Sequence, residues 1–174
     1  GSSREEVELQ VDSTEMSVSE PFYELISASI EGRLSVVNQL LTKGAQVNKT
    51  DDVGRSALME ASSFGRYGVV KSLLESGAKV NITDNQKMTA LMFATLEGRE
   101  RVVSLLLDWK ADVNATDAEG VSSLMLAGNE GRTEIARLLI KHGAKINWQS
   151  KSGSSALMEA ALEGRSDTVK LLVD

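Results

Sequence analysis

The pattern of apolar and polar positions along the chain repeats every 33 residues, which is typical of a repeat protein. An apolar stretch such as ALMEAS at 57–62 is followed by a glycine and then by a second stretch such as VVKSLL at 69–74. The phrase SALMEASSFGR at 56–66 returns as SALMEAALEGR at 155–165, three periods later. Each period therefore predicts two short helices.

Five columns hold one residue type when the periods are aligned without gaps. They are Leu25, Leu58, Leu91, Leu124 and Leu157; Ala28, Ala61, Ala94, Ala127 and Ala160; Gly32, Gly65, Gly98, Gly131 and Gly164; Arg33, Arg66, Arg99, Arg132 and Arg165; and Asn48, Asn81, Asn114 and Asn147. Neither helix of a period can bury its apolar face alone. We therefore expect stacked periods that share one continuous core.

The sequence also predicts where the helices begin and end. A Ser or Thr that suits an N-cap precedes each first helix, and a glycine such as Gly77 fits the left-handed residue that closes each second helix. Segments rich in Asn, Asp and Gly then predict turns or hairpins between periods. The predicted N-caps are Ser56, Thr89, Ser122 and Ser155.

These columns resemble ankyrin repeats. The resemblance covers 22–174 and implies an all-α, ankyrin-type solenoid of helix-turn-helix repeats with connecting β-hairpin loops, in units of about 22–50, 51–83, 84–116, 117–149 and a truncated 150–174. Where the family favours His, this chain has methionine, which packs flexibly, so we expect the fold to survive. The methionines are Met59, Met92, Met125 and Met158.

The third unit breaks the glycine pattern. Lys87 and Lys110 stand where other units have glycine, and a lysine in a left-handed conformation costs about 1 kcal/mol. Beside Trp109, Lys110 indicates either a contact site or ordinary drift between repeats.

Charge is uneven along the 174 residues, whose net charge is −6. Residues 1–20 hold six acids and one arginine, whereas the remainder is nearly balanced. We predict an acidic, disordered leader over 1–20, beginning with a tag remnant at 1–3, and a repeat domain over 21–174. The segment 7–11 also alternates like an extended strand. A balanced body argues against nucleic-acid binding, and the absence of a long apolar run argues against an anchor, a signal peptide or membrane insertion.

Catalytic and metal chemistry find little support. The chain has no cysteine and one histidine, His142, and no glycine-rich phosphate loop. We therefore predict no enzyme and no cofactor. The arginine column could read a polyanion, but Glu31, Glu97, Glu130 and Glu163 lie two residues before four of its members, so we expect ion pairs. Three glycosylation sequons begin at Asn48, Asn81 and Asn114. The resemblance gives this asparagine a structural hydrogen bond, which favours an intracellular, cytoplasmic protein.

The resemblance further implies that a partner lies along the concave surface made by the hairpin tips and first helices. Residues there differ between units, as expected if they contact something foreign. We predict a groove, with apolar and acidic residues, for a protein segment with apolar anchors and basic flanks. The predicted binding residues are Asp52, Val53, Arg55, Glu60, Phe64, Met88, Phe93, Leu96, Glu97, Glu119, Val121, Leu126, Asn129, Glu130, Trp148, Glu159, Leu162 and Glu163.

The expected function is therefore protein–protein interaction, in a scaffold or adaptor role. The alternative is a structural spacer or a self-assembling array without a groove ligand. It is favoured by the last unit, which stops at Asp174 inside its second helix, as if cut from a longer array or covered by another chain. The oligomeric state is left open.

Overall fold

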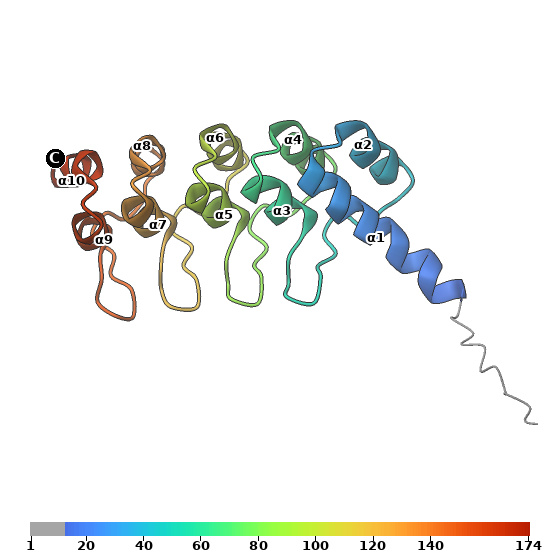
Figure 1. Ribbon diagram of the computed structural model, residues 1–174, viewed down its shortest axis with the longest axis horizontal. Coiled ribbons are helices and arrows are strands. Elements are labelled where there is room, and N and C mark those ends of the chain that lie inside the picture. The colour runs from blue at the N-terminus through green and yellow to red at the C-terminus, as the bar shows by residue number, and fades with distance from the viewer. Residues whose placement is uncertain (1–12) are drawn as a thin grey trace, which may run out of the picture.

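The computed structural model describes residues 13–174, with side chains from Pro21 onward. The described residues form ten helices in five pairs, which stand in a row with hairpin loops projecting from one side (Figure 1). The pairs are α1 (Ser13–Glu31) with α2 (Leu34–Thr42), α3 (Ala57–Ser63) with α4 (Tyr67–Glu75), α5 (Ala90–Leu96) with α6 (Glu100–Asp108), α7 (Ser123–Glu130) with α8 (Thr133–Lys141), and α9 (Ala156–Leu162) with α10 (Ser166–Val173).

The helix pairs stack in two layers. The first helices α1, α3, α5, α7 and α9 pack in series, and the second helices α2, α4, α6, α8 and α10 form the other layer. Apolar side chains between the layers make one continuous core, as the sequence predicts. Within the described residues, the hairpins contain only isolated β-bridges. These lie between Thr116 and Ser122 and between Gln149 and Ser155.

The four predicted N-caps are confirmed. Each hydroxyl oxygen accepts a hydrogen bond from the backbone N–H three residues later, where the methionine column stands. The distances are 3.2 Å for Ser56 and 3.3 Å for Thr89, Ser122 and Ser155. Met59, Met92 and Met125 are buried. These three methionines therefore pack in the core without disturbing the helix start, whereas Met158 is exposed.

Three of the hairpin tips are each organised by one aspartate. The sequence pattern did not predict this role. Asp51, Asp84 and Asp117 each accept two backbone N–H bonds through Oδ1, from the residues two and four positions later, at 2.8–3.0 Å. Such Asp turns fix the backbone without a β-ladder. Ser150 takes this place in the fifth unit and instead contacts Ser152 through its hydroxyl.

The asparagine column joins each unit to the next one. Asn48 Oδ1 accepts from the Lys79 N–H at 2.8 Å, and Asn48 Nδ2 donates to the Gly77 carbonyl at 3.1 Å. Asn81 and Asn114 repeat both bonds one unit further along. The sequon asparagines are therefore structural, although their partners lie in the following unit.

The arginine column does not form the expected ion pairs, except for Arg33 with Glu31 at 2.8 Å. Instead, each later arginine donates to a backbone carbonyl 36 residues earlier, at the end of the preceding first helix. The bonds run from Arg66 to Ile30, Arg99 to Ser63, Arg132 to Leu96 and Arg165 to Asn129, at 2.9–3.2 Å.

The path of the arginine side chain across the preceding unit explains why that unit has a glycine at this position. A Cβ on Gly65 would lie 2.8 Å from Arg99 Cδ, and Gly65 also has φ +70°, which disfavours a side chain. The same close approach occurs at Gly32, Gly98 and Gly131. Lys87 and Lys110 have φ values of 62° and 66°, so the predicted left-handed lysines are confirmed.

The N-terminal boundary differs from the expectation. Helix α1 begins at Ser13 and runs through Pro21, so it crosses the boundary drawn at residue 21, and residues 13–20 are helical. That boundary was drawn from charge, and acidic residues near a helix N-terminus suit the macrodipole rather than ending the helix. The strand expected at 7–11 lies outside the described residues, as does the rest of 1–12.

The close packing of the first helices predicts opposite effects for two helical glycines. A Cβ on Gly128 in α7 would lie 2.6 Å from the backbone oxygen of Ala156, whereas one on Gly68 in α4 would meet only Leu34 Cδ2 at 3.4 Å. Alanine is intrinsically the better helix former. We expect Gly68→Ala to raise the free energy of unfolding by about 0.5 kcal/mol and Gly128→Ala to lower it by about 1–3 kcal/mol, measured by urea denaturation. Equal signs would contradict this packing.

Candidate partner-binding face

The hairpin tips and the first helices share one side of the molecule, which we call the inner face (Figure 1). Each tip leads directly into an N-capped first helix, so the Asp turn and the cap together fix where the tip residues stand. The second helices form the opposite layer. The predicted binding residues all lie at these tips, on the first helices or at their ends, except Trp148 at a hairpin base.

The predicted binding residues differ in exposure. Phe93 is buried, with 5% of its surface exposed, so it is not available as an apolar anchor. The half-buried residues are Arg55, Glu60, Met88, Leu96, Val121, Leu126, Asn129, Glu130 and Glu159. The exposed residues are Asp52, Val53, Phe64, Glu97, Glu119, Trp148, Leu162 and Glu163.

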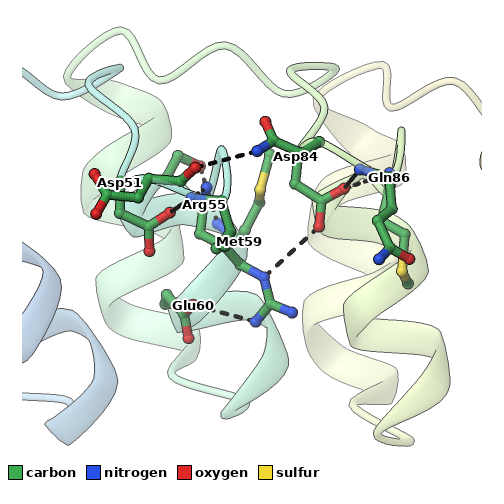
Figure 2. A network of polar contacts seen from close by, with 11 residues as sticks. Asp51, Arg55, Met59, Glu60, Asp84 and Gln86 are labelled. Carbon is green, nitrogen blue, oxygen red and sulfur yellow. Dashed lines mark hydrogen bonds and ion pairs between the residues drawn. The ribbon is translucent and has the colours of Figure 1, made fainter.

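Arg55 covers Phe93. Its guanidinium carbon lies 4.3 Å from the centroid of the Phe93 ring, which is cation–π geometry. Arg55 Nη1 donates to Glu60 Oε1 at 3.3 Å, and Arg55 Nε lies 3.7 Å from Asp84 Oδ2 (Figure 2). The guanidinium thus has an aromatic ring on its face and carboxylates at its edge, which holds it on the second and third units.

Asp84 connects this cluster to the hairpin of the third unit. Its Oδ1 accepts from the N–H groups of Gln86 and Met88 at 2.9 Å, while Oδ2 faces Arg55 (Figure 2). The Asp84 side chain is only 7% exposed. A carboxylate buried to this degree needs the nearby cation and these donors. Arg55 and Glu60, both predicted to bind a partner, therefore satisfy groups of the chain itself.

Glu159 and Asn129 also bond within the chain. Asn129 Nδ2 donates to Glu159 Oε2 at 2.9 Å, and the Ser154 hydroxyl donates to Glu159 Oε1 at 2.5 Å. This carboxylate therefore bridges the fourth and fifth units. A partner would have to compete with these bonds to reach it.

Trp148 is fixed at one edge and exposed elsewhere. Its indole N–H donates to the Gly120 carbonyl at 2.9 Å, and Lys145 Nζ lies 5.8 Å from the ring centroid. The side chain remains 41% exposed. Trp148 therefore attaches its hairpin to the preceding one and still offers an aromatic surface.

Five inner-face carboxylates form no ion pair with any residue that the structure describes. Three of them occupy one column: Glu97 and Glu163 are the C-caps of α5 and α9, and Glu130 ends α7. A helix C-terminus carries partial negative charge, so these carboxylates make that edge more negative. Phe64, the C-cap of α3, holds the same column and is 44% exposed. The other two carboxylates, at hairpin tips, are Asp52 and Glu119.

Residues 13–174, which the structure describes, contain neither a candidate metal site nor a candidate membrane span. No group of three or more His, Cys, Asp or Glu is placed to hold a metal ion. No helix there combines the length and the apolar character needed to cross a bilayer.

The Arg55 cluster predicts a measurable loss of stability. Arg55→Ala uncovers Phe93 and leaves Asp84 without its cation, so we expect the free energy of unfolding to fall by about 1–2 kcal/mol. Arg101 stacks on Tyr67 at 4.2 Å without carboxylate partners, so Arg101→Ala should cost only about 0.5 kcal/mol. Chemical denaturation measures both. Equal losses would show that the carboxylates add nothing.

Comparison with known sequences agrees with this geometry. A family model described as ankyrin repeats, in three copies, matches residues 25–117 and again residues 110–174. No curated protein matches the chain. The matched residues cover most of the sequence and contain the end of α1, all of α2 to α10, the capped first helices and the Asn and Arg junctions between units. The chain therefore belongs to the ankyrin repeat family.

Proposed function

We propose that the inner face binds an extended segment of another protein, so that the chain acts as a non-enzymatic scaffold or adaptor. Ankyrin repeats are in general protein–protein interaction modules, and this chain carries their architecture. The proposal places the partner across the third, fourth and fifth units, beside the carboxylate column defined above.

The main support is the row of unpaired carboxylates beside accessible apolar side chains. Glu97, Glu130 and Glu163 repeat at the same position of three successive units. Exposed Leu162 and half-buried Leu96 stand one residue before two of them. Because carboxylate repulsion is relieved by cations, a segment with basic residues next to apolar ones complements this face.

The spacing of the units limits the partner's pattern. Packed helices lie about 10 Å apart, and an extended chain advances about 3.3 Å per residue. Side chains of a fully extended strand alternate between its two sides, whereas those of a polyproline II segment return to the same side at every third residue, about 9 Å further along. Basic side chains at every third position of a polyproline II segment would therefore face successive carboxylates. Intervening apolar side chains would reach Leu96, Leu126 and Leu162.

The proposal excludes several of the expected contributors. Phe93 lies beneath Arg55, and Glu60 is occupied by that arginine. Val53 and Phe64, both exposed in the second unit, are the apolar residues that a longer segment would meet first. The balanced charge of residues 21–174 favours a protein partner over a nucleic acid, and the structural sequon asparagines favour an intracellular, cytoplasmic setting.

The experiment selects ligands without assuming their identity. Peptides of about 12 residues, the length that spans roughly 40 Å, are selected from a display library on the intact chain. The selected sequences should be rich in Lys or Arg with apolar neighbours. Binding of a selected peptide is then measured on the triple variant Glu97→Gln, Glu130→Gln and Glu163→Gln. We expect its Kd to rise at least tenfold and its salt dependence to weaken.

A matched variant controls for net charge. Glu75, Glu100 and Asp108 are exposed acids on the second helices, outside the inner face. Glu75→Gln, Glu100→Gln and Asp108→Asn remove the same three charges, and binding should be unchanged. Equal weakening by both triple variants would indicate attraction by net charge alone, and unaltered binding by the inner-face variant would reject the proposed face.

A further inference from the structure

The column that ends the first helices changes its chemistry in the second unit. Glu97, Glu130 and Glu163 hold this column in the third, fourth and fifth units, whereas Phe64 holds it as the C-cap of α3. Phe64 is 44% exposed. The row of carboxylates therefore ends, one unit towards the N-terminus, at a single aromatic surface.

The backbone on both sides of Phe64 is held by the following unit. The Ser63 carbonyl accepts a hydrogen bond from Arg99 Nε at 3.0 Å, and a Cβ on Gly65 would lie 2.8 Å from Arg99 Cδ. The Phe64 N–H donates to the Glu60 carbonyl at 3.1 Å. Because its backbone is already ordered, an exposed ring at this position loses little freedom when a partner contacts it. Phe64 therefore has the properties of a preorganised apolar anchor.

Helix α3 offers no free carboxylate beside this ring. Its one acid, Glu60, accepts a hydrogen bond from Arg55 Nη1 at 3.3 Å, and the Glu60 side chain is only 13% exposed. A basic side chain of the partner would therefore meet no unpaired charge on α3. An apolar side chain would instead remove the Phe64 ring from water, which is favourable. The second unit thus selects a different side chain from the third, fourth and fifth units.

We infer that Phe64 is a specificity-determining residue, which receives an apolar side chain of the bound segment and so fixes the register of that segment on the carboxylate row. This inference rests on the proposed function, because it concerns the same segment. Units about 10 Å apart match every third residue of a polyproline II segment, at intervals of about 9 Å. The recognised pattern is therefore one apolar residue at the end of a run of basic residues, with a step of about three residues from each member to the next.

The first experiment compares peptides selected on two forms of the chain. The same display library is selected on the intact chain and on Phe64→Glu, which extends the carboxylate row into the second unit. Peptides selected on the intact chain should have an apolar residue at the end of the basic pattern, and those selected on Phe64→Glu should have a further Lys or Arg there. Phe64→Glu should fold, because glutamate already occupies this column in three units, and urea denaturation checks this.

A double-mutant cycle then measures the contact itself. One peptide selected on the intact chain is prepared with its terminal apolar residue retained and with that residue replaced by Lys. We expect Phe64→Glu to raise the Kd of the apolar peptide about tenfold and to lower the Kd of the Lys peptide, so that the two changes are coupled. Phe64→Ala should weaken the apolar peptide to a similar degree without strengthening the Lys peptide, which separates loss of the ring from gain of charge.

Trp109→Glu is the matched control. Trp109 is the C-cap of α6, a second helix outside the inner face, and is 41% exposed. The substitution therefore exchanges an aromatic C-cap for a carboxylate at a similar exposure and changes the net charge equally. The Kd of both peptides should stay unchanged.

Any of three outcomes would overturn the inference. The first is a set of selected peptides that depend on the carboxylate row but have no apolar residue at the end of the basic pattern. The second is additive effects in the cycle, because Phe64 would then not contact the exchanged residue. The third is an equal change in Kd with Phe64→Glu and Trp109→Glu, which would assign the effect to net charge.

The proposed function is decided by a different variant. The triple variant Glu97→Gln, Glu130→Gln and Glu163→Gln should weaken the apolar peptide whether or not Phe64 contacts it. Loss of that effect would reject the inner-face proposal, whereas its persistence with an uncoupled Phe64 would reject only the role of Phe64.

Discussion

The arginine that crosses from one unit to the glycine of the unit before it sets the geometry of the molecule. A Cβ on Gly65 would lie 2.8 Å from Arg99 Cδ, and the arginine Nε bonds the Ser63 carbonyl at 3.0 Å. The ends of α1, α3, α5 and α7 therefore each have a carbonyl satisfied by the following unit. Because the same contact recurs at all four junctions, each unit is attached to the one before it in the same way.

This regularity explains why variable positions do not all serve a partner. Arg55, Glu60 and Phe93 occupy columns that differ between units, yet they pack with Asp84 into one cluster across two units. A residue that differs from its column can therefore be accommodated by side chains of the adjacent unit, as Phe93 is by Arg55. Variation along a repeat protein therefore marks either a foreign contact or a local exchange of packing partners, and burial distinguishes the two.

The sequence was sufficient for the helix pairs, the N-caps and the left-handed Lys87 and Lys110, because each depends on residues close together in one unit. It was insufficient where the partner lies in another unit. The arginines were expected to pair with Glu two residues earlier, but their hydrogen bonds reach 36 residues back. Phe93 was expected on the surface because one unit alone does not show that Arg55 of the preceding unit covers it.

The carboxylates of Glu97, Glu130 and Glu163, at the ends of three first helices, form no ion pair within the described residues. Glu97, Glu130 and Glu163 add negative charge where the helix dipole is already negative, which opposes folding slightly. By contrast, Asp84 and Glu159 have partners and join units together. The fold would keep its core, caps and junctions with neutral residues in that column. Folding therefore does not require these three carboxylates, and they could pair with a cationic partner. Binding of such a partner would offset the repulsion between each carboxylate and the negative end of its helix.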